Sequence, residues 1–106
     1  MMSFVARLKD KVQKEHLWFF ILLLLLGQAR YGYELRKLVR ERFGFWSGNV
    51  TAYRVLYSLE SAGLVKREML ERRKYYSITE TGEKEVQTAK DFLNGVLKSA
   101  NASGKR

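Results

Sequence analysis

Two groups of basic and polar side chains in this sequence could bind a polyanion. The first lies on a helical pattern over about residues 49–62, and the residues that we assign to it are Asn49, Thr51, Tyr53, Arg54 and Ser58. The major groove of DNA is about 12 Å wide and admits one helix, which must present short polar and basic side chains near its start. The first group therefore indicates a helix that contacts double-stranded DNA. For Tyr53, packing against the core and contact with a phosphate both remain open.

The second group lies on two strand-like segments, residues 64–70 and 74–79, which residues 71–73 join as a charged tip. Its cations are Lys66, Arg67, Arg72, Arg73 and Lys74. Arginine and lysine on a hairpin beside a recognition helix can reach phosphates or the minor groove. An ordinary solvated hairpin tip would carry similar charges, so this alternative stays open.

Charge and composition favour a polyanionic partner and argue against several other classes. The 106 residues include 20 Lys and Arg against 11 Asp and Glu, a net charge of +9, which favours nucleic acid or an anionic membrane surface. With no cysteine and one histidine, His16, we expect no disulfide, no metal and no cofactor. No nucleophile is paired with a base and no glycine-rich phosphate loop is present, so we predict no enzyme. The lack of cysteine is compatible with a cytoplasmic, DNA-associated protein.

Residues 17–26 are ten consecutive apolar residues. A membrane-spanning helix needs roughly 20, and charged residues flank this run on both sides. We therefore interpret it as a buried core helix and predict no membrane span. Association with a membrane surface, through this run and the basic residues before it, is the alternative.

The spacing of apolar residues predicts a mainly α-helical fold with a small β-hairpin. Residues 1–16 form an amphipathic helix with apolar residues at Phe4, Val5, Leu8 and Val12, and it either continues past His16 or breaks there. Residues 17–80 form one domain in which residues 28–30 are a turn, a helix runs from Tyr31 to Phe43, and Ser47 or Asn49 caps the next helix. Thr79 is expected to cap a last helix over residues 81–100, and residues 101–106 form a polar tail.

The last helix carries an apolar stripe that has no obvious surface to cover within the chain. The stripe consists of Val86, Ala89, Phe92, Leu93, Val96 and Leu97. We predict that these residues form a dimer interface. Trp18 and Trp46 are interpreted as core or interface residues, and one of Tyr75 and Tyr76 as a core residue.

Four segments, in this order and spacing, resemble the PadR family of winged-helix transcription regulators over roughly residues 20–87. They are Tyr31-Gly32-Tyr33-Glu34-Leu35, Thr51-Ala52-Tyr53, the Leu-x-x-Leu-Glu-x-x-Gly-Leu pattern from Leu56, and Arg72-Arg73-Lys74-Tyr75-Tyr76-Ser77-Ile78-Thr79-Glu80-Thr81-Gly82. The resemblance implies a winged helix-turn-helix with extra N- and C-terminal helices, with Tyr33 of the second helix among the DNA contacts. It also implies a homodimer that pairs through the last helix and reads two half-sites.

Two residues depart from the family pattern. Val50 stands where the family often has glycine, and Arg54 where it often has proline. Both lie where DNA would be read, so the family's operator preferences do not carry over. Some relatives bind aromatic effectors at the dimer interface; here the last helix offers Phe92 but no tryptophan, which leaves a small aromatic effector open.

The function that we expect is sequence-specific binding of double-stranded DNA by a homodimeric transcription regulator, most often a repressor in such families. An architectural protein that coats DNA with little sequence preference is the first alternative. A membrane-surface protein is the second.

Overall fold

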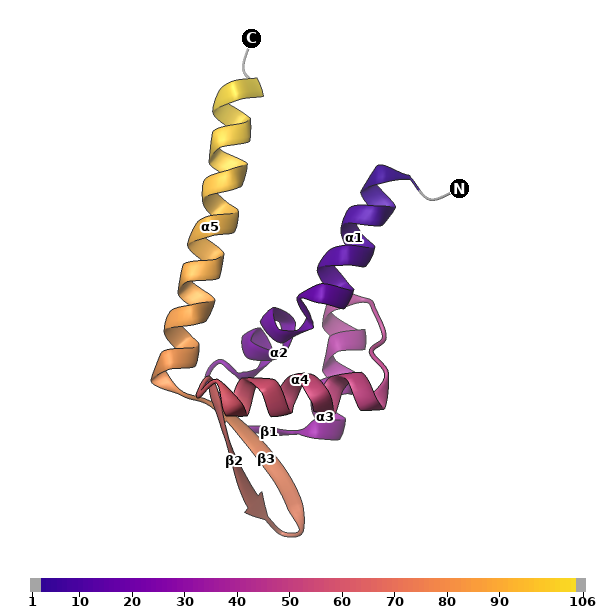
Figure 1. Cartoon of the computed structure of the whole chain (residues 1–106), viewed down its shortest axis with the longest axis vertical. Helices are drawn as coiled ribbons and strands as arrows, with labels where there is room; N and C mark the ends of the chain where they lie inside the picture. Colours follow the sequence, from indigo (N-terminus) through magenta and orange to yellow (C-terminus); the bar gives the residue numbers. More distant parts are fainter. Residues whose placement is uncertain (1–2, 105–106) are drawn as a thin grey trace.

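The computed structural model describes residues 3–104, which contain five α-helices, one π-helical segment and three strands. These elements are α1 (Phe4–Glu15), α2 (Leu17–Leu25), β1 (Arg30–Tyr31), α3 (Gly32–Leu38), η1 (Val39–Phe43), α4 (Asn49–Ser61), β2 (Val65–Leu70), β3 (Arg73–Ile78) and α5 (Glu80–Gly104). The predicted mainly helical fold with a small hairpin is confirmed. Figure 1 shows α1 and α5 extending from one side of the body and the β2–β3 hairpin from the other.

The apolar run forms α2 and supplies the centre of the core. Five of its side chains are buried: Leu17, Ile21, Leu22, Leu24 and Leu25. They pack with Leu35 of α3 and Val39 of η1, and with buried residues of α4, β2, β3 and α5. Most of the run is thus used inside the protein, which removes the main apolar contribution to a membrane-surface role. Within residues 3–104, no helix is both long and apolar enough to cross a bilayer.

The N-terminal helix stands apart from this core. Ser3 caps α1 by accepting a hydrogen bond from the backbone N–H of Ala6 (3.0 Å), and the helix ends at Glu15. His16 separates α1 from α2, so the helix breaks there rather than continuing. No residue of α1 is buried, and Phe4 is 82% exposed. The apolar stripe of α1 is therefore not covered by the rest of the described chain.

The sheet has three strands in the order β1-β3-β2, all antiparallel. Arg30 was predicted to lie in a turn; instead it pairs with Tyr76 in the two-residue strand β1. A strand of two residues is too short to show an alternating pattern in the sequence. It is a strand only because it pairs with β3. Tyr76 is buried and Tyr75 is partly exposed, which confirms that one of the two is a core residue.

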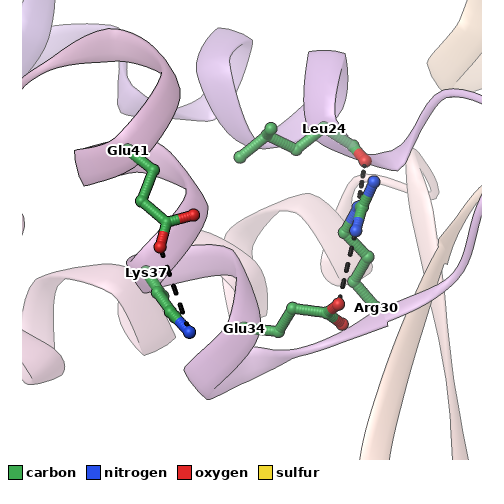
Figure 2. A network of polar contacts seen from close by, with 5 residues as sticks. All are labelled: Leu24, Arg30, Glu34, Lys37 and Glu41. Carbon is green, nitrogen blue, oxygen red and sulfur yellow. Dashed lines mark hydrogen bonds and ion pairs between the residues drawn. The ribbon is translucent and has the colours of Figure 1, made fainter.

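Buried Arg30 ties together the end of α2 and the start of α3. Its Nε donates to the carbonyl oxygen of Leu24 (2.7 Å), and one of its terminal nitrogens donates to the Glu34 carboxylate (3.3 Å). Figure 2 shows this chain of contacts beside the surface pair of Lys37 and Glu41. The guanidinium satisfies an orphan carbonyl at a helix end, so it helps to set the position at which α3 begins.

The loop before α4 differs from the expectation. Neither Ser47 nor Asn49 caps the helix: its N-cap is Gly48 without a side-chain bond, and Asn49 is already helical. Phe45 packs edge-on against Phe20, with ring centroids 5.0 Å apart. This packing holds the loop, and the Ser47 hydroxyl lies buried without a hydrogen-bond partner.

The predicted cap of α5 is confirmed. The Thr79 hydroxyl accepts from the backbone N–H of Gly82 (3.0 Å) and donates to the carbonyl oxygen of Gly63 (2.7 Å). The predicted polar tail is helical as far as Gly104, and residues 105–106 lie outside the described residues. Within the predicted interface stripe, Val86 is a correction: it is 1% exposed and belongs to the chain's own core.

Candidate DNA-binding surface

The start of α3, one side of α4 and the tip of the hairpin meet in a concave surface of about 340 Å³. It is lined by Tyr31, Gly32, Tyr33, Tyr53, Met69, Arg72, Arg73 and Lys74. The lining includes three cations and no acidic residue. The structure thus brings together three wing residues predicted from the sequence with two predicted tyrosines, Tyr33 and Tyr53.

Aromatic rings support the base of this surface. Tyr31 and Tyr33 are nearly parallel, with ring centroids 6.4 Å apart, and the Arg73 guanidinium lies 4.6 Å from the Tyr31 centroid. An arginine over an aromatic face is held by attraction to the ring quadrupole. Arg73 is therefore held near the root of the surface, and Tyr33, 62% exposed, stands at its edge.

The hairpin tip is a two-residue turn. Glu71 and Arg72 both have positive φ, 49° and 68°, as the tight turns that match the twist of two strands require. The tip was predicted as residues 71–73, but Arg73 already belongs to β3. Arg72 therefore occupies the tip, and Lys74 follows on the strand.

Two other predicted wing residues lie elsewhere on the hairpin. Arg67 faces Tyr76 across the strands, and its Nε is 3.5 Å from the Glu60 carboxylate of α4. Arg67 thus braces the hairpin against α4. Side chains alternate along a strand, so Lys66 lies on the opposite face from Arg67.

Tyr76, behind this bracing pair, is buried near its charges. Burial raises the pKa of the Tyr76 phenol from its ordinary value of 10.0, and Arg67 opposes that shift. Because the folded state favours the neutral phenol, this burial stabilises the protein fully below pH 10, and the stabilisation is lost as the pH rises through the raised pKa of Tyr76. The hairpin root is therefore uncharged at this position under ordinary conditions.

The Tyr53 ring of α4 packs directly against Gly32 at the start of α3. A Cβ at Gly32 would lie 2.5 Å from the Tyr53 hydroxyl oxygen and 2.6 Å from Cε1 of its ring. Only glycine allows the ring of α4 to lie this close to the first turn of α3. Tyr53 is nevertheless 41% exposed, so one edge packs on Gly32 and the rest lines the concave surface. Packing and DNA contact are compatible at this residue.

Replacing Gly32 with alanine is expected to weaken DNA binding about tenfold while leaving the protein folded. The methyl group meets the far end of a flexible side chain, so Tyr53 can swing aside, and the concave surface loses its shape. Fluorescence anisotropy with a labelled duplex measures the affinity, and circular dichroism checks the fold. The matched control is Gly95→Ala in α5, outside the concave surface, where an added Cβ meets no atom within 4 Å; equal binding by the two variants would contradict this role for Tyr53.

The predicted residues of α4 do not form one face. Tyr53 lies beside the wing, whereas Arg54 and Ser58 line a groove of about 380 Å³ with Trp18 of α2 and Glu85 of α5. Thr51 lies on the side of α4 toward α1, in a hollow with Asp10, Gln13 and Lys14. The exposed part of α4 thus has four predicted residues in three different places: Tyr53 faces the wing, Arg54 and Ser58 face α2 and α5, and Thr51 faces α1.

Two residues on the outer side of α4 were not among the predicted DNA contacts, although Val50 was expected to lie where DNA would be read. Val50 and Tyr57 are each 70% exposed. They are seven residues apart, which places them on the same side of a helix, opposite the buried Ala52, Leu56 and Leu59. This spacing could have identified them from the sequence, but a valine and a tyrosine on a helix usually indicate packing residues. A base can offer a methyl group or a stacking face to such side chains.

The chain is similar in sequence and fold to known transcription regulators. The model of the transcriptional regulator PadR-like family matches residues 21–88, more than half of the chain. A PadR family transcription regulator from Clostridium difficile R20291 is 28% identical, with a TM-score of 0.76 over 85% of this chain and 99% of that one. A transcriptional regulator from Clostridium thermocellum is 29% identical, with a TM-score of 0.77 over 90% of this chain and 99% of that one.

A more distant protein shares the fold alone. F93 from STIV, a winged-helix DNA-binding protein, is 20% identical, with a TM-score of 0.69 over 78% of this chain and 91% of that one. No curated protein sequence gives a significant match. The helices α2 to α4, the β2–β3 wing and the family match over them lead to one conclusion: this chain belongs to the PadR-like family, and is a transcription regulator with a winged-helix DNA-binding fold rather than an enzyme.

Proposed function

We propose that this regulator is a homodimer that binds double-stranded DNA at specific operator sequences and represses transcription. The observation that carries the proposal is the concave surface between α3, α4 and the wing, where Arg72, Arg73 and Lys74 meet three tyrosines and no acid. Cations at the wing supply phosphate contacts, which position the protein, and α4 supplies contacts to base edges, which choose the site. Tyr33, Tyr53, Arg72, Arg73 and Lys74 are the residues that we assign to this surface.

The exposed stripe of α5 supports the dimer. Four of its apolar residues are 46–68% exposed: Phe92, Leu93, Val96 and Leu97. An exposed apolar patch of this kind on a regular helix favours a protein partner. A second copy related by a two-fold axis buries the same stripe on both chains, and Ala89, which is partly exposed, extends it toward the body. Helix α1 extends from the same side of the molecule as α5 (Figure 1), and its exposed apolar residues are available to the same interface.

The dimer also gives a mechanism for repression. Two copies of α4 face two half-sites separated by about one helical turn. Occupancy of such a site covers the promoter and excludes polymerase. The position of α5 and α1 on the side opposite the wing leaves both DNA-binding surfaces free when the stripe is paired.

The experiment is selection from a random duplex library, with sequencing of the retained DNA at low and moderate salt. A specific dimer enriches a motif with two-fold symmetry, and the enrichment persists when salt is raised. Binding without enrichment that collapses with salt would mean an architectural coat. Enrichment of a single, asymmetric half-site would leave specific binding in place and remove the dimer. A reporter placed behind the selected motif then distinguishes repression from activation.

A further inference from the structure

A second cationic pocket lies on the exposed side of α3, outside the surface described above. It has a volume of about 380 Å³ and is lined by Tyr33, Arg36, Lys37, Arg40, Glu41 and Trp46. Three of these residues are cations and one is an acid. The acid, Glu41, is 3.9 Å from the ammonium group of Lys37, so its charge faces that lysine rather than the two arginines.

Trp46 holds both arginines at this pocket. The guanidinium carbon of Arg36 is 5.2 Å from the Trp46 ring centroid, and that of Arg40 is 5.1 Å from it. The Trp46 ring itself is 59% exposed, so the core alternative predicted for Trp46 is wrong. Two guanidinium groups on one ring keep their charge while they lose rotational freedom. The ring thus preorganises the guanidinium groups of Arg36 and Arg40, each of which can donate two parallel hydrogen bonds to a pair of oxygens.

The hydrogen-bonding capacity of these arginines is largely unused. Within residues 3–104, neither Arg36 nor Arg40 forms a salt bridge. One terminal nitrogen of Arg36 donates to the carbonyl oxygen of Ser47 (3.4 Å), and its Nε is buried without a partner. The backbone at Arg40 is π-helical, a rare local geometry that often marks a functional site. Such unpaired donors favour an acceptor of negative charge.

Tyr33 joins this pocket to the DNA-binding surface, because it lines both. We infer that Arg36, Arg40 and Trp46 form a second anchor, which binds a backbone phosphate of the same duplex at a position separate from the wing contact. This inference rests on the proposed function. The ligand is a phosphodiester, which offers two charged oxygens to a guanidinium fork and no sequence information. The anchor therefore adds affinity and orientation without adding base preference.

The test uses the full-length protein and an operator duplex taken from the library selection. Arg40→Gln removes one fork, and Arg42→Gln is its matched control, because Arg42 lies in the same segment, is exposed and does not line the pocket. Arg40→Gln is expected to weaken binding about fivefold to tenfold and to lower the slope of log Kd against log salt by about 1. Arg42→Gln is expected to stay within about twofold of the parent, and the enriched motif is expected to stay the same in both variants.

Ethylation of individual phosphates locates the contact. With the parent protein, ethylation interferes at two sets of phosphates; Arg40→Gln is expected to lose one set and Arg72→Gln the other. Trp46→Ala is expected to lose the Arg40 set as well, and Trp46→Phe to retain it. Loss of the same phosphates in Arg40→Gln and Arg72→Gln, or an unchanged pattern in Arg40→Gln, would overturn the second anchor. Failure of the parent protein to select any motif would instead remove the proposed function.

Discussion

Neutralising the wing with Arg72→Gln and Lys74→Gln together is expected to weaken operator binding by about 10²-fold at low salt. Each cation that contacts a phosphate releases counterions, so the slope of log Kd against log salt should fall by about 2 for the pair. Arg72 sits at the turn and Lys74 follows on β3, and both are exposed on the concave surface. Arg73 is left in place because it packs on Tyr31. Titrations of a labelled operator at several salt concentrations measure both quantities.

The matched control removes the same charge from α5. Lys84→Gln with Lys98→Gln takes away two exposed cations that lie outside the concave surface. This pair is expected to change affinity by less than about threefold, through the net charge alone. If the α5 pair weakened binding as much as the wing pair, the net charge of the whole protein would explain the affinity, and direct phosphate contacts by the wing would be contradicted.

Replacing Gly82 with alanine is expected to destabilise the protein by about 3 kcal/mol. A Cβ at this buried position would collide with the carbonyl oxygen of Leu64 and lie 2.7 Å from Cγ1 of Ile78. The carbonyl belongs to the backbone and cannot turn aside. The first turn of α5 would have to move, and the Leu64 carbonyl also accepts from the Thr79 N–H (3.0 Å) at the junction between α4, the wing and α5. Urea unfolding at one fixed protein concentration measures the loss.

Gly95 supplies the control within the same helix. An added Cβ there meets no atom within 4 Å, and glycine in a helix interior costs about 1 kcal/mol relative to alanine. Gly95→Ala is therefore expected to stabilise the protein by up to about 1 kcal/mol. The two substitutions are chemically identical and should have opposite signs; a Gly82→Ala variant as stable as the parent would show that α5 can shift without cost.

Several elements were predictable because their signal is local. The ten-residue apolar run was too short to span a membrane and was interpreted as a core helix, and it forms α2, whose buried side chains lie at the centre of the core. Thr79 before two acids predicted the start of α5, since the hydroxyl and the carboxylates both suit a helix N-terminus. The strand-like pattern from residue 64 to residue 79 predicted all four ends of the hairpin strands to within one residue. In each case, neighbours along the chain carry the information.

Other features depended on contacts between distant segments, and these were missed. The strand at Arg30 and Tyr31 exists only because β3 lies beside it. Val86 looked like the first residue of an unpaired stripe, but the fold of α5 onto α2 buries it, while Phe92 and Leu97 beyond the body stay exposed. Ser47 looked like a helix cap, but aromatic packing at Phe45 directs the loop so that Gly48 takes that place.

The charge, the order of the helices and the hairpin, and the identity of the basic residues that a DNA duplex could attract all followed from the sequence alone. It determined these because periodicity, capping residues and charge are properties of short segments. Which of those residues work together depends on the tertiary fold: Tyr53 packs on Gly32 and lines one surface with Tyr33 and the wing, Arg67 forms an ion pair with Glu60, and Trp46 lies under two arginines. Each of these depends on side chains separated along the chain coming within a few ångströms, and only the packing of the core sets that distance.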